Sequence, residues 1–332
     1  MERLIVKNFG PLKDVDIELN KINLFIGENG SGKSVLAKLI IIVFNSSFYG
    51  SDKKKFLKFF MDYGIDYIQE DTYIQYKVNN IVVCSLEKKN IQLVEMRGLS
   101  LLAQYIPAER NLISLFSKSL STLLVEDIPL PKLLLHFSSE YEKARNKIRE
   151  LTFLNVKYVN ADNDRIYYTE NEYLDLEHSS SGIQSALPLY VTVKYFAQKH
   201  KNIIIEEPEE NLFPKAQAET IKYIIEQVSD ENSLFMMTHS PYVLSTLNIL
   251  MMAHKVGNLN EEVKEKVEAL IPESQWMNRD NFSAYYLKDG EARDIKGRTG
   301  LISDNEIDEV SDDIEFEFEE LLTIYREHKN DK

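Results

Sequence analysis

INLFIGENGSGKSVLAKLIIIVF, residues 22–44 of the chain, changes character twice. An apolar run passes into a polar octet with three glycines, and the chain then becomes apolar again at helical spacing. The octet, residues 27–34, fits G-x-x-x-x-G-K-[ST], the phosphate-binding loop that joins a strand to a helix. Its glycines permit backbone conformations that a Cβ would obstruct, so successive N–H groups can turn inward around phosphate oxygens. The positive end of the following helix favours the same anion.

Two side chains of the octet have specific expected roles. Lys33 is predicted to reach the β and γ phosphates of a nucleotide, and the Ser34 hydroxyl is predicted to coordinate Mg²⁺. An ordinary glycine turn before a core helix is the alternative, but the strand before and the helix after the octet favour nucleotide binding. The expected phosphate-loop positions are Gly27, Glu28, Asn29, Gly30, Ser31, Gly32, Lys33, Ser34 and Val35.

Length and composition set the protein class. The 332 residues suffice for about two domains, or for one large lobed domain. Hydrophobic residues make up 44% and charged residues 28%, as in a soluble globular protein. Cys84 is the single cysteine, so a reducing compartment is expected. No apolar run reaches transmembrane length, because Lys38 interrupts the longest, and MERLIVKNFG lacks the form of a signal peptide. We therefore expect a cytoplasmic protein with no membrane contact.

The net charge of −14 argues against a chain whose main task is to grip nucleic acid. Such binding would need a local basic patch, and the sequence offers one in DKKKFLKFF, residues 52–60. A solvated helix face explains these lysines better than a nucleic-acid contact. Nucleic acid therefore remains a possible partner only indirectly or through this patch, whose lysines are Lys53, Lys54, Lys55 and Lys58.

The phosphate loop lies in a strand-rich lobe. Residues 2–26 read as short strands, RLIVKNF, VDIEL and INLFI, and the alternating pattern continues over residues 73–96. Over residues 111–154 the pattern becomes helical, with Pro129 and Pro131 between two segments. This organisation predicts a mixed sheet that holds the loop, followed by a helical insertion.

A hairpin-like stretch, VKYVNADNDRIYYTE, follows the helical segments. Its pair Asp162 and Asp164 suggests a metal site. Asn160 and Asn163 stand beside these aspartates, and such side chains favour turns. A polar hairpin tip is therefore the preferred interpretation.

Paired carboxylates follow a buried strand in KNIIIEEPEENLFP, residues 201–214. Glu206 is predicted to bind Mg²⁺, directly or through water, opposite Ser34. Glu207 is predicted to orient the attacking water and act as a general base. A merely solvated strand end is the alternative, and the phosphate loop elsewhere in the chain disfavours it.

Two further motifs lie at helix starts. Ser179, Ser180 and Ser181 precede a helical apolar pattern, so they present hydroxyls and free N–H groups at a helix N-terminus, as a second anion site or as a simple cap. In NSLFMMTHSPYV, a buried strand ends at His239 before a new helix begins. A lone histidine is more often structural, but this position favours a hydrogen bond to the γ-phosphate and the catalytic water.

Taken in order, the phosphate loop, SSSGIQ, IIIEEPE and MMTHS resemble the motif set of the ABC-type ATPases, specifically the non-transport branch that contains RecF, SMC and OLD-family proteins. The opening LIVKNFGPLKDVDIELN, YIPAERN and EEPEENLFP are similar to that branch as well, so the resemblance covers about residues 1–250. It implies an α/β fold: an ABC-type P-loop ATPase head with a mixed sheet lobe and a small helical signature lobe. The implied ligands are ATP and Mg²⁺.

The resemblance also assigns residues position by position. Ser181, Gly182 and Gln184 match the L-S-G-G-Q signature, whereas Ile183 stands where the signature has its second glycine. Gln104 is the candidate for the glutamine that contacts Mg²⁺ and nucleotide. Arg110 of IPAER is implied as a γ-phosphate or coupling residue. In this family two chains stack head to tail, so ATP on the phosphate loop of one chain is closed by Ser181 of the other.

The organisation implied is a single ATPase head over residues 1–332. Its nucleotide-binding lobe comprises 1–110 and 188–300, its helical signature lobe 111–187, and its acidic C-terminal helix 301–332. Only 144 residues separate Ser34 from Ser179, so SMC-type coiled coils are not expected. FSAYYLKDGEARDI, residues 282–295, predicts a terminal hairpin with Asp289 and Gly290 at its turn, and the tail after it is not expected to hold the TOPRIM domain of OLD nucleases. We therefore expect a slow ATPase whose dimerisation regulates a separate effector, a nuclease or toxin, in bacterial anti-phage defence or DNA maintenance. The alternatives are an ATP-gated scaffold with little hydrolysis, or a transporter ATPase subunit, which EEPE and the altered signature disfavour.

The tail, LISDNEIDEVSDDIEFEFEELLTIYREH, has helical apolar spacing at Ile307, Val310, Ile314, Leu321 and Tyr325. Ser303 is the expected N-cap. Ten acidic residues and no basic residue lie between Asp304 and Glu320. The first interpretation is a helix packed on its own domain with a solvated acidic face, and the second is a docking surface for a basic partner.

Overall fold

The computed structural model describes residues 2–45, 52–94, 103–116, 130–161, 163–199, 201–303 and 306–329, and within the last helix it describes the side chains of residues 315–326. Several sequence positions named above lie outside these ranges: Pro129, Asp162, Asp304, residues 95–96 and the side chains of Ile307, Val310 and Ile314.

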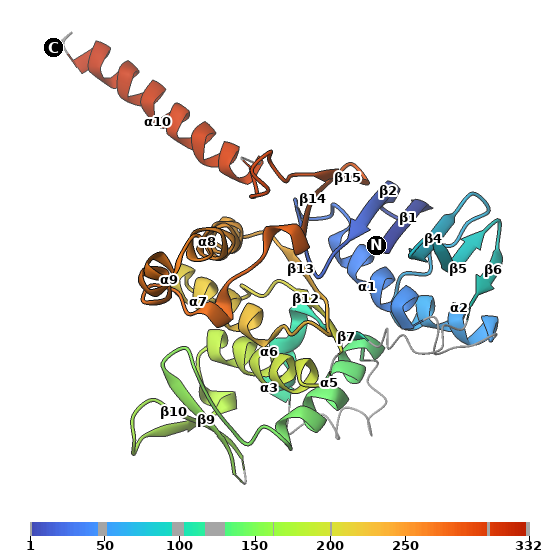
Figure 1. The fold of residues 1–332 in the computed structure, drawn as a ribbon, viewed down its shortest axis with the longest axis horizontal. Coiled ribbons are helices and arrows are strands. Elements are labelled where there is room, and N and C mark those ends of the chain that lie inside the picture. The colour runs from blue at the N-terminus through green and yellow to red at the C-terminus, as the bar shows by residue number, and fades with distance from the viewer. Residues whose placement is uncertain are drawn as a thin grey trace.

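A mixed sheet runs through the described part of the molecule, with strand order β6-β5-β4-β1-β2-β15-β14-β3-β13-β12-β7 (Figure 1). From β6 to β2 neighbouring strands are antiparallel, whereas β14, β3, β13, β12 and β7 run parallel. The predicted mixed sheet is therefore confirmed. The strands are β1 (Glu2–Phe9), β2 (Leu12–Leu19), β3 (Ile22–Gly27), β4 (Tyr73–Val78), β5 (Ile81–Glu87), β6 (Asn90–Leu93), β7 (Ala103–Ile106), β12 (Asn202–Glu206), β13 (Leu234–Thr238), β14 (Phe282–Lys288) and β15 (Glu291–Asp294).

Helices cover both faces of the parallel strands, which explains why nearly every residue of those strands is buried. Along β12, Ile203 and Ile205 join the core under α6, α7 and α8, whereas Ile204 joins the core under α1 and α2. The helices are α1 (Lys33–Phe44), α2 (Lys53–Asp62), α3 (Asn111–Phe116), α5 (Lys132–Arg145), α6 (Ser181–Ala197), α7 (Pro214–Gln227), α8 (Pro241–Gly257), α9 (Glu261–Glu268) and α10 (Glu306–Lys329), with 3-10 turns η2 (Ala108–Arg110), η3 (Leu176–His178), η4 (Glu273–Gln275) and η5 (Arg279–Asn281).

Between α5 and η3 the chain forms a second, four-stranded antiparallel sheet, with order β11-β10-β9-β8. Its strands are β8 (Glu150–Phe153), β9 (Val156–Asn160), β10 (Asp164–Tyr167) and β11 (Tyr173–Asp175). The segment predicted as a helical lobe thus contains a sheet as well as helices. The predicted lobe boundary after residue 187 also falls inside the continuous helix α6, because one helix both carries the signature and packs on the main sheet.

The lysine-rich helix α2 has the amphipathic form expected of a solvated face. Phe56 and Phe60 are buried, while Lys53, Lys54 and Lys58 are exposed. Phe56 and Phe60 are four residues apart and so share one face of the helix, while the lysines lie on the other faces. α2 therefore presents its lysines on an exposed helix face.

The predicted terminal hairpin is confirmed: β14 and β15 pair antiparallel, with Asp289 and Gly290 in left-handed conformations at the turn. The cap predicted for the last helix is wrong. α10 begins at Glu306, and the Ser303 hydroxyl instead donates to the carbonyl oxygen of Ile295 at 2.9 Å.

Helix α10 projects away from the rest of the molecule (Figure 1). Its Phe316 is 65%, Phe318 61% and Leu321 65% exposed. Packing on its own domain, the first interpretation of this helix, would bury such side chains, so the structure contradicts it for the described part of α10.

Candidate nucleotide site

The phosphate loop forms where the sequence predicts it, between the end of β3 and the start of α1. Gly32 is the N-cap of α1 and has a φ of 101°, a left-handed conformation that favours glycine. A Cβ at this position would lie 2.7 Å from Cδ2 of Leu12, so the close approach of this side chain also favours glycine. Glu28, Asn29 and Gly30 are exposed, while Ser31 and Val35 are half-buried.

Lys33 folds back over this loop. Its Nζ donates to the carbonyl oxygens of Gly27 at 2.7 Å and Glu28 at 2.8 Å. Burial lowers the pKa of Lys33 to about 8, although the nearby carboxylates of Glu207 and Glu206 act in the opposite direction. The ammonium is thus held among loop carbonyls, where phosphate oxygens would be stronger partners.

Ser34 and Glu206 meet across the sheet edge. The Ser34 hydroxyl donates to Oε2 of Glu206 at 2.5 Å, and the Tyr105 hydroxyl donates to its other carboxylate oxygen. Burial raises the pKa of Glu206, while both hydrogen bonds oppose this shift. A hydroxyl beside one carboxylate suits Mg²⁺, which usually takes one or two carboxylates and completes its shell with phosphate and water. The residues present therefore fit the predicted ion.

Gln104 does not join this pair. It pairs with Ile203 at the start of β12, whereas Glu206 ends that strand, about 10 Å further along. Its Nε2 donates to the carbonyl oxygen of Tyr105 at 3.1 Å. The prediction that Gln104 binds Mg²⁺ and nucleotide is therefore wrong, because side chains alternate along β7 and it is Tyr105 that reaches Glu206.

Glu207 and His239 lie together at the carboxyl ends of β12 and β13, as predicted. Nε2 of His239 is 3.2 Å from Oε1 of Glu207. This hydrogen bond is the main cause that lowers the pKa of Glu207, despite partial burial. Glu207 has a φ of +44°, an uncommon conformation that its N–H bond to the carbonyl of Met237 at 2.8 Å helps to hold.

Glu209 is a site residue that the sequence motifs did not identify. Its Oε1 accepts from the Thr238 hydroxyl at 2.6 Å and from the backbone N–H of His239 at 2.8 Å. These bonds fix the end of β13 against the loop after β12, and so fix His239 beside Glu207. The sequence pointed to Glu209 only by its place in EEPEE, residues 206–210, and this pattern does not show which of the four glutamates have which role.

The serine cluster begins α6, as predicted. Ser180 caps the helix, accepting from the N–H of Ile183 at 3.5 Å, and Ser181 is exposed at the first helical position. A Cβ on Gly182 would lie 2.9 Å from the carbonyl oxygen of Asn211, so the loop after β12 packs closely against the signature.

Gln184 points inward, contrary to its predicted contact with nucleotide. The side chain is 6% exposed, and Nε2 donates to the carbonyls of Leu176 at 3.3 Å and Glu177 at 2.9 Å. Both amide hydrogens are therefore used to hold η3 against α6. Gln184 lies in the part of α6 that packs into the protein, where its neighbours Ile183 and Ser185 are buried as well.

Arg110 is also buried, with an exposed fraction of 0%. Its guanidinium donates to the carbonyl oxygens of Glu206 at 2.8 Å, Glu207 at 2.7 Å and Ser185 at 3.1 Å. A γ-phosphate has no access to a guanidinium enclosed in this way. In this conformation Arg110 therefore does not contact the γ-phosphate. Of the two roles implied for Arg110, the coupling role stays a prediction.

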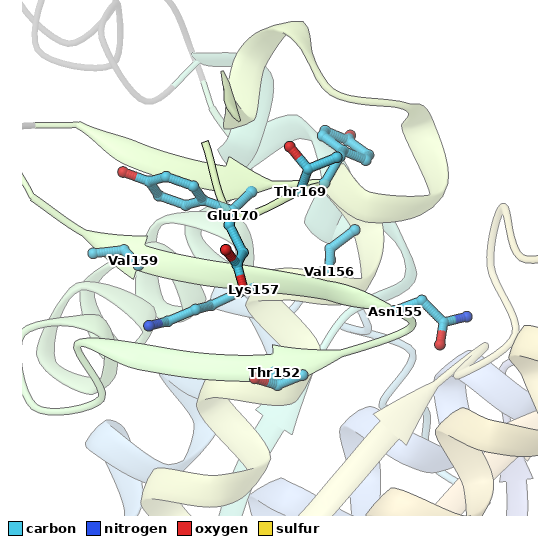
Figure 2. Close-up of a pocket in the computed structure, with 9 residues that line it drawn as sticks. Thr152, Asn155, Val156, Lys157, Val159, Thr169 and Glu170 are labelled. Atoms are coloured by element: carbon cyan, nitrogen blue, oxygen red, sulfur yellow. The ribbon is translucent and has the colours of Figure 1, made fainter. Parts of the chain in front are cut away.

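A cavity of about 590 Å³ lies away from these residues and is lined by residues of the four-stranded sheet and the turns that join its strands (Figure 2). Thr152, Lys157 and Glu170 contribute to its lining, and Lys157 is paired with Glu150 at 3.0 Å. None of its lining residues comes from the phosphate loop, β12 or α6. The cavity is thus separate from the candidate site.

The aspartate pair of the second sheet does not form a metal site in the described part of the chain. Asp164 accepts from Arg145 at 2.7 Å and from the Tyr158 hydroxyl at 2.8 Å, which gives it a structural role. Among the described residues, no cluster of three or more histidine, cysteine, aspartate or glutamate side chains is arranged to hold a metal. None of the helices described has the length and apolar character needed to cross a membrane.

Solved structures with a similar arrangement include the SMC head bound to the C-winged helix domain of ScpA, with 12% identity, a TM-score of 0.46 and coverage of 88% of this chain and 96% of that chain. The SMC head domain from Thermotoga maritima gives 12% identity, a TM-score of 0.42 and coverage of 88% and 97%. The ADP conformation of MJ1267, an ATP-binding cassette of an ABC transporter, gives 15% identity, a TM-score of 0.42 and coverage of 94% of this chain and 98% of that chain.

A search of curated proteins gave no match. The sequence does match the AAA ATPase domain over residues 1–121 and 104–244, which include the phosphate loop, Glu206, Glu207 and His239. The matched residues form most of the chain and contain both halves of the candidate site. The predicted P-loop ATPase class is thereby confirmed, and the chain belongs to the AAA ATPase domain family.

Proposed function

We propose that the chain binds ATP with Mg²⁺ and hydrolyses it to ADP and phosphate, as the ABC-type ATPases do. One observation carries this proposal: Ser34, Glu206, Glu207 and His239 meet at one sheet edge, directly beside the phosphate loop. Ligands of α/β sheets bind at the carboxyl ends of the strands, where these side chains lie.

The loop and α1 would hold the triphosphate through backbone N–H groups and the helix N-terminus. Lys33 would exchange its two carbonyl partners for oxygens of the β and γ phosphates. Ser34 and Glu206 would hold Mg²⁺, which when bound neutralises charge on the phosphates. Tyr105 keeps Glu206 oriented by donating to its other carboxylate oxygen.

Hydrolysis needs a base for the attacking water. Glu207 is ionised at neutral pH because the hydrogen bond with His239 lowers its pKa. Its carboxylate would accept the water proton as the water oxygen bonds to the γ-phosphorus and the bond to the bridging oxygen of ADP breaks. His239 would orient Glu207 and donate to the γ-phosphate.

Head-to-tail dimerisation would complete the site. The N-terminus of α6 is exposed at Ser181, where a second chain could approach it, while Gly182 packs against the backbone of Asn211 in its own chain. A free helix N-terminus of this kind stabilises an anion. We therefore assign Ser181 and Gly182 to the γ-phosphate of ATP held by a second copy.

A separate effector would attach through α10. Phe316, Phe318 and Leu321 are exposed among the exposed glutamates 315, 317, 319 and 320. Two copies of α10 would repel each other because of these acids, whereas a groove with apolar walls and a basic rim would complement both features. We propose a nuclease or toxin of bacterial defence or DNA maintenance as the partner, in keeping with the resemblance.

The test of the composite site uses two inactive variants. Lys33→Ala removes the phosphate-loop cation, and Ser181→Arg blocks the signature, so each homodimer has two damaged sites. A mixed dimer has one doubly damaged site and one intact site. Mixing should therefore restore part of the ATPase activity, with its maximum near equal proportions.

A parallel measurement covers the case in which both sites must act together. Glu207→Gln should trap the ATP-bound dimer, which light scattering detects as a doubling of mass. A Glu207→Gln protein that binds ATP yet stays monomeric, combined with no recovery on mixing, would refute the head-to-tail arrangement.

A further inference from the structure

Arg110 occupies a position that links two parts of the site. Nε donates to the carbonyl of Ser185 in α6, and Nη1 and Nη2 donate to the carbonyls of Glu206 and Glu207. Nη1 also donates to the carbonyl of Pro107 at 3.1 Å, which anchors the guanidinium to the turn that precedes it. One planar group thus ties the helix that begins with the signature to the strand end that carries the catalytic carboxylate.

Glu210 closes a second connection between the same parts. Its Oε2 lies 3.6 Å from Nη2 of Arg110 and accepts from the Ser185 hydroxyl at 2.7 Å. Nearby, the Ser114 hydroxyl donates to the carbonyl of Gln184 at 2.7 Å, so α3 fixes the adjacent residue of α6. Ser185 is therefore held twice: its carbonyl accepts from Arg110, and its hydroxyl donates to Glu210, which is paired with Arg110. Both connections lead through Arg110 to the backbone carbonyl of Glu207.

Burial makes this network stiff. A fully buried guanidinium has no water to replace a lost acceptor, so any displacement of α6 must either move Arg110 or leave buried N–H groups unpaired. Burial lowers the pKa of Arg110, and the carboxylates of Glu210 and Glu209 oppose that shift. A lysine could not replace the residue functionally, because its ammonium lacks the planar fork of donors.

Glu207 is the residue best placed to respond. Its left-handed φ of +44° is an unfavourable conformation for a side chain of this kind, and it persists only where its surroundings impose it. Two hydrogen bonds are such constraints: the Glu207 N–H donates to the carbonyl of Met237, and the Glu207 carbonyl accepts from Arg110. The direction of its carboxylate therefore depends on where Arg110 lies.

We propose that Arg110, Ser185 and Glu210 form a buried bridge that sets the position of Glu207 according to the position of the signature helix. The proposal rests on the proposed function, in which Ser181 engages ATP on a second copy. Engagement would shift the start of α6, and the bridge would move Glu207 of the same chain. Each chain would thus hydrolyse its own ATP in response to the ATP of its neighbour. Arg110 is a positioning residue in this scheme, because it acts through Glu207.

The experiment measures ATPase rate against ATP concentration for the full chain and for Arg110→Lys. A misplacement of Glu207 by about 1 Å lowers kcat roughly 100-fold. The Hill coefficient of the variant should fall to roughly one, because the sites no longer communicate. Fluorescent ATP analogue affinity should remain within about twofold, since the phosphate loop is untouched.

Two further variants separate positioning from folding. Glu210→Gln keeps Arg110 and its four carbonyl acceptors but removes the shared charge, and it should lower kcat and the Hill coefficient in the same direction by a smaller factor. Arg145→Lys makes the matched change in the Arg145–Asp164 pair of the second sheet, and it should leave both quantities unchanged.

The outcomes distinguish the bridge from the function on which it rests. A wild-type chain without ATP turnover would refute the proposed function and the bridge with it. A cooperative, active wild type together with unchanged kcat and Hill coefficient in folded Arg110→Lys and Glu210→Gln would refute the bridge alone. Equal losses in Arg145→Lys would also refute it, because the effect would then be one of general stability.

Discussion

Raising the pH above 8 should weaken ATP binding through Lys33. Burial lowers the pKa of this lysine to about 8, so the free protein releases the proton above that pH. Bound phosphates would favour the charged ammonium and raise its pKa. ATP binding must then take up a proton, and affinity is greatest below pH 8 and falls as the pH rises through that value.

The size of the effect follows from the fraction of Lys33 that is protonated. That fraction is about 90% at pH 7 and about 3% at pH 9.5 for a pKa of about 8. The dissociation constant should therefore increase about 30-fold between these pH values, which corresponds to about 2 kcal/mol. An ordinary lysine, with a pKa of about 10.4, would give a change of less than about 20% over the same range.

Titration of a fluorescent ATP analogue from pH 7 to 9.5 at fixed ionic strength measures this dependence. The terminal phosphate has a pKa of about 6 and contributes little in this range. Lys33→Arg keeps its charge and should lose the pH dependence whatever its absolute affinity, while Lys58→Arg on the surface of α2 should retain it. A flat profile in the wild type would refute the assignment of a buried Lys33 as the phosphate cation.

Three other substitutions test separate roles. Glu207→Gln should retain ATP binding while kcat falls by about 100-fold or more, because the base is lost. Lys33→Ala should instead abolish tight ATP binding. Equal loss of ATP binding in the two variants would contradict the roles assigned to Glu207 and Lys33. Glu206→Gln should raise the Mg²⁺ concentration needed for half-maximal activity, and an unchanged Mg²⁺ titration would count against its role. Effector association should weaken as salt is raised, and deletion of residues 303–332 should abolish it while sparing the ATPase; loss of ATPase activity or solubility on deletion would contradict the docking role of α10.

Local patterns in the sequence were sufficient for the phosphate loop, the mixed sheet and the terminal hairpin. In each case the physical requirement is contained within a few consecutive residues: glycines that bend a loop, alternation that separates two faces, or Asp289 and Gly290 in a tight turn. Glu206, Glu207 and His239 were found in the same way, since the carboxyl ends of parallel strands meet at one edge.

Motif position alone was a poor guide to the direction of a side chain. Gln104 and Arg110 occur in the expected part of the sequence, but one lies within a strand away from the edge and the other is enclosed by carbonyls. Tyr105 and Glu209 contact site residues and were not identified, because a tyrosine in a strand and one glutamate among four have no distinguishing local pattern.

The sequence by itself determined the elements that depend on local backbone geometry and on strand and helix periodicity, together with the residue types available to bind phosphate. Only the tertiary structure decided that Gln184 turns inward, that Tyr105 holds Glu206, and that Arg110 joins α6 to Glu207. These contacts join residues far apart in the chain, and whether a polar side chain faces a ligand or a buried carbonyl depends on which segments pack around it.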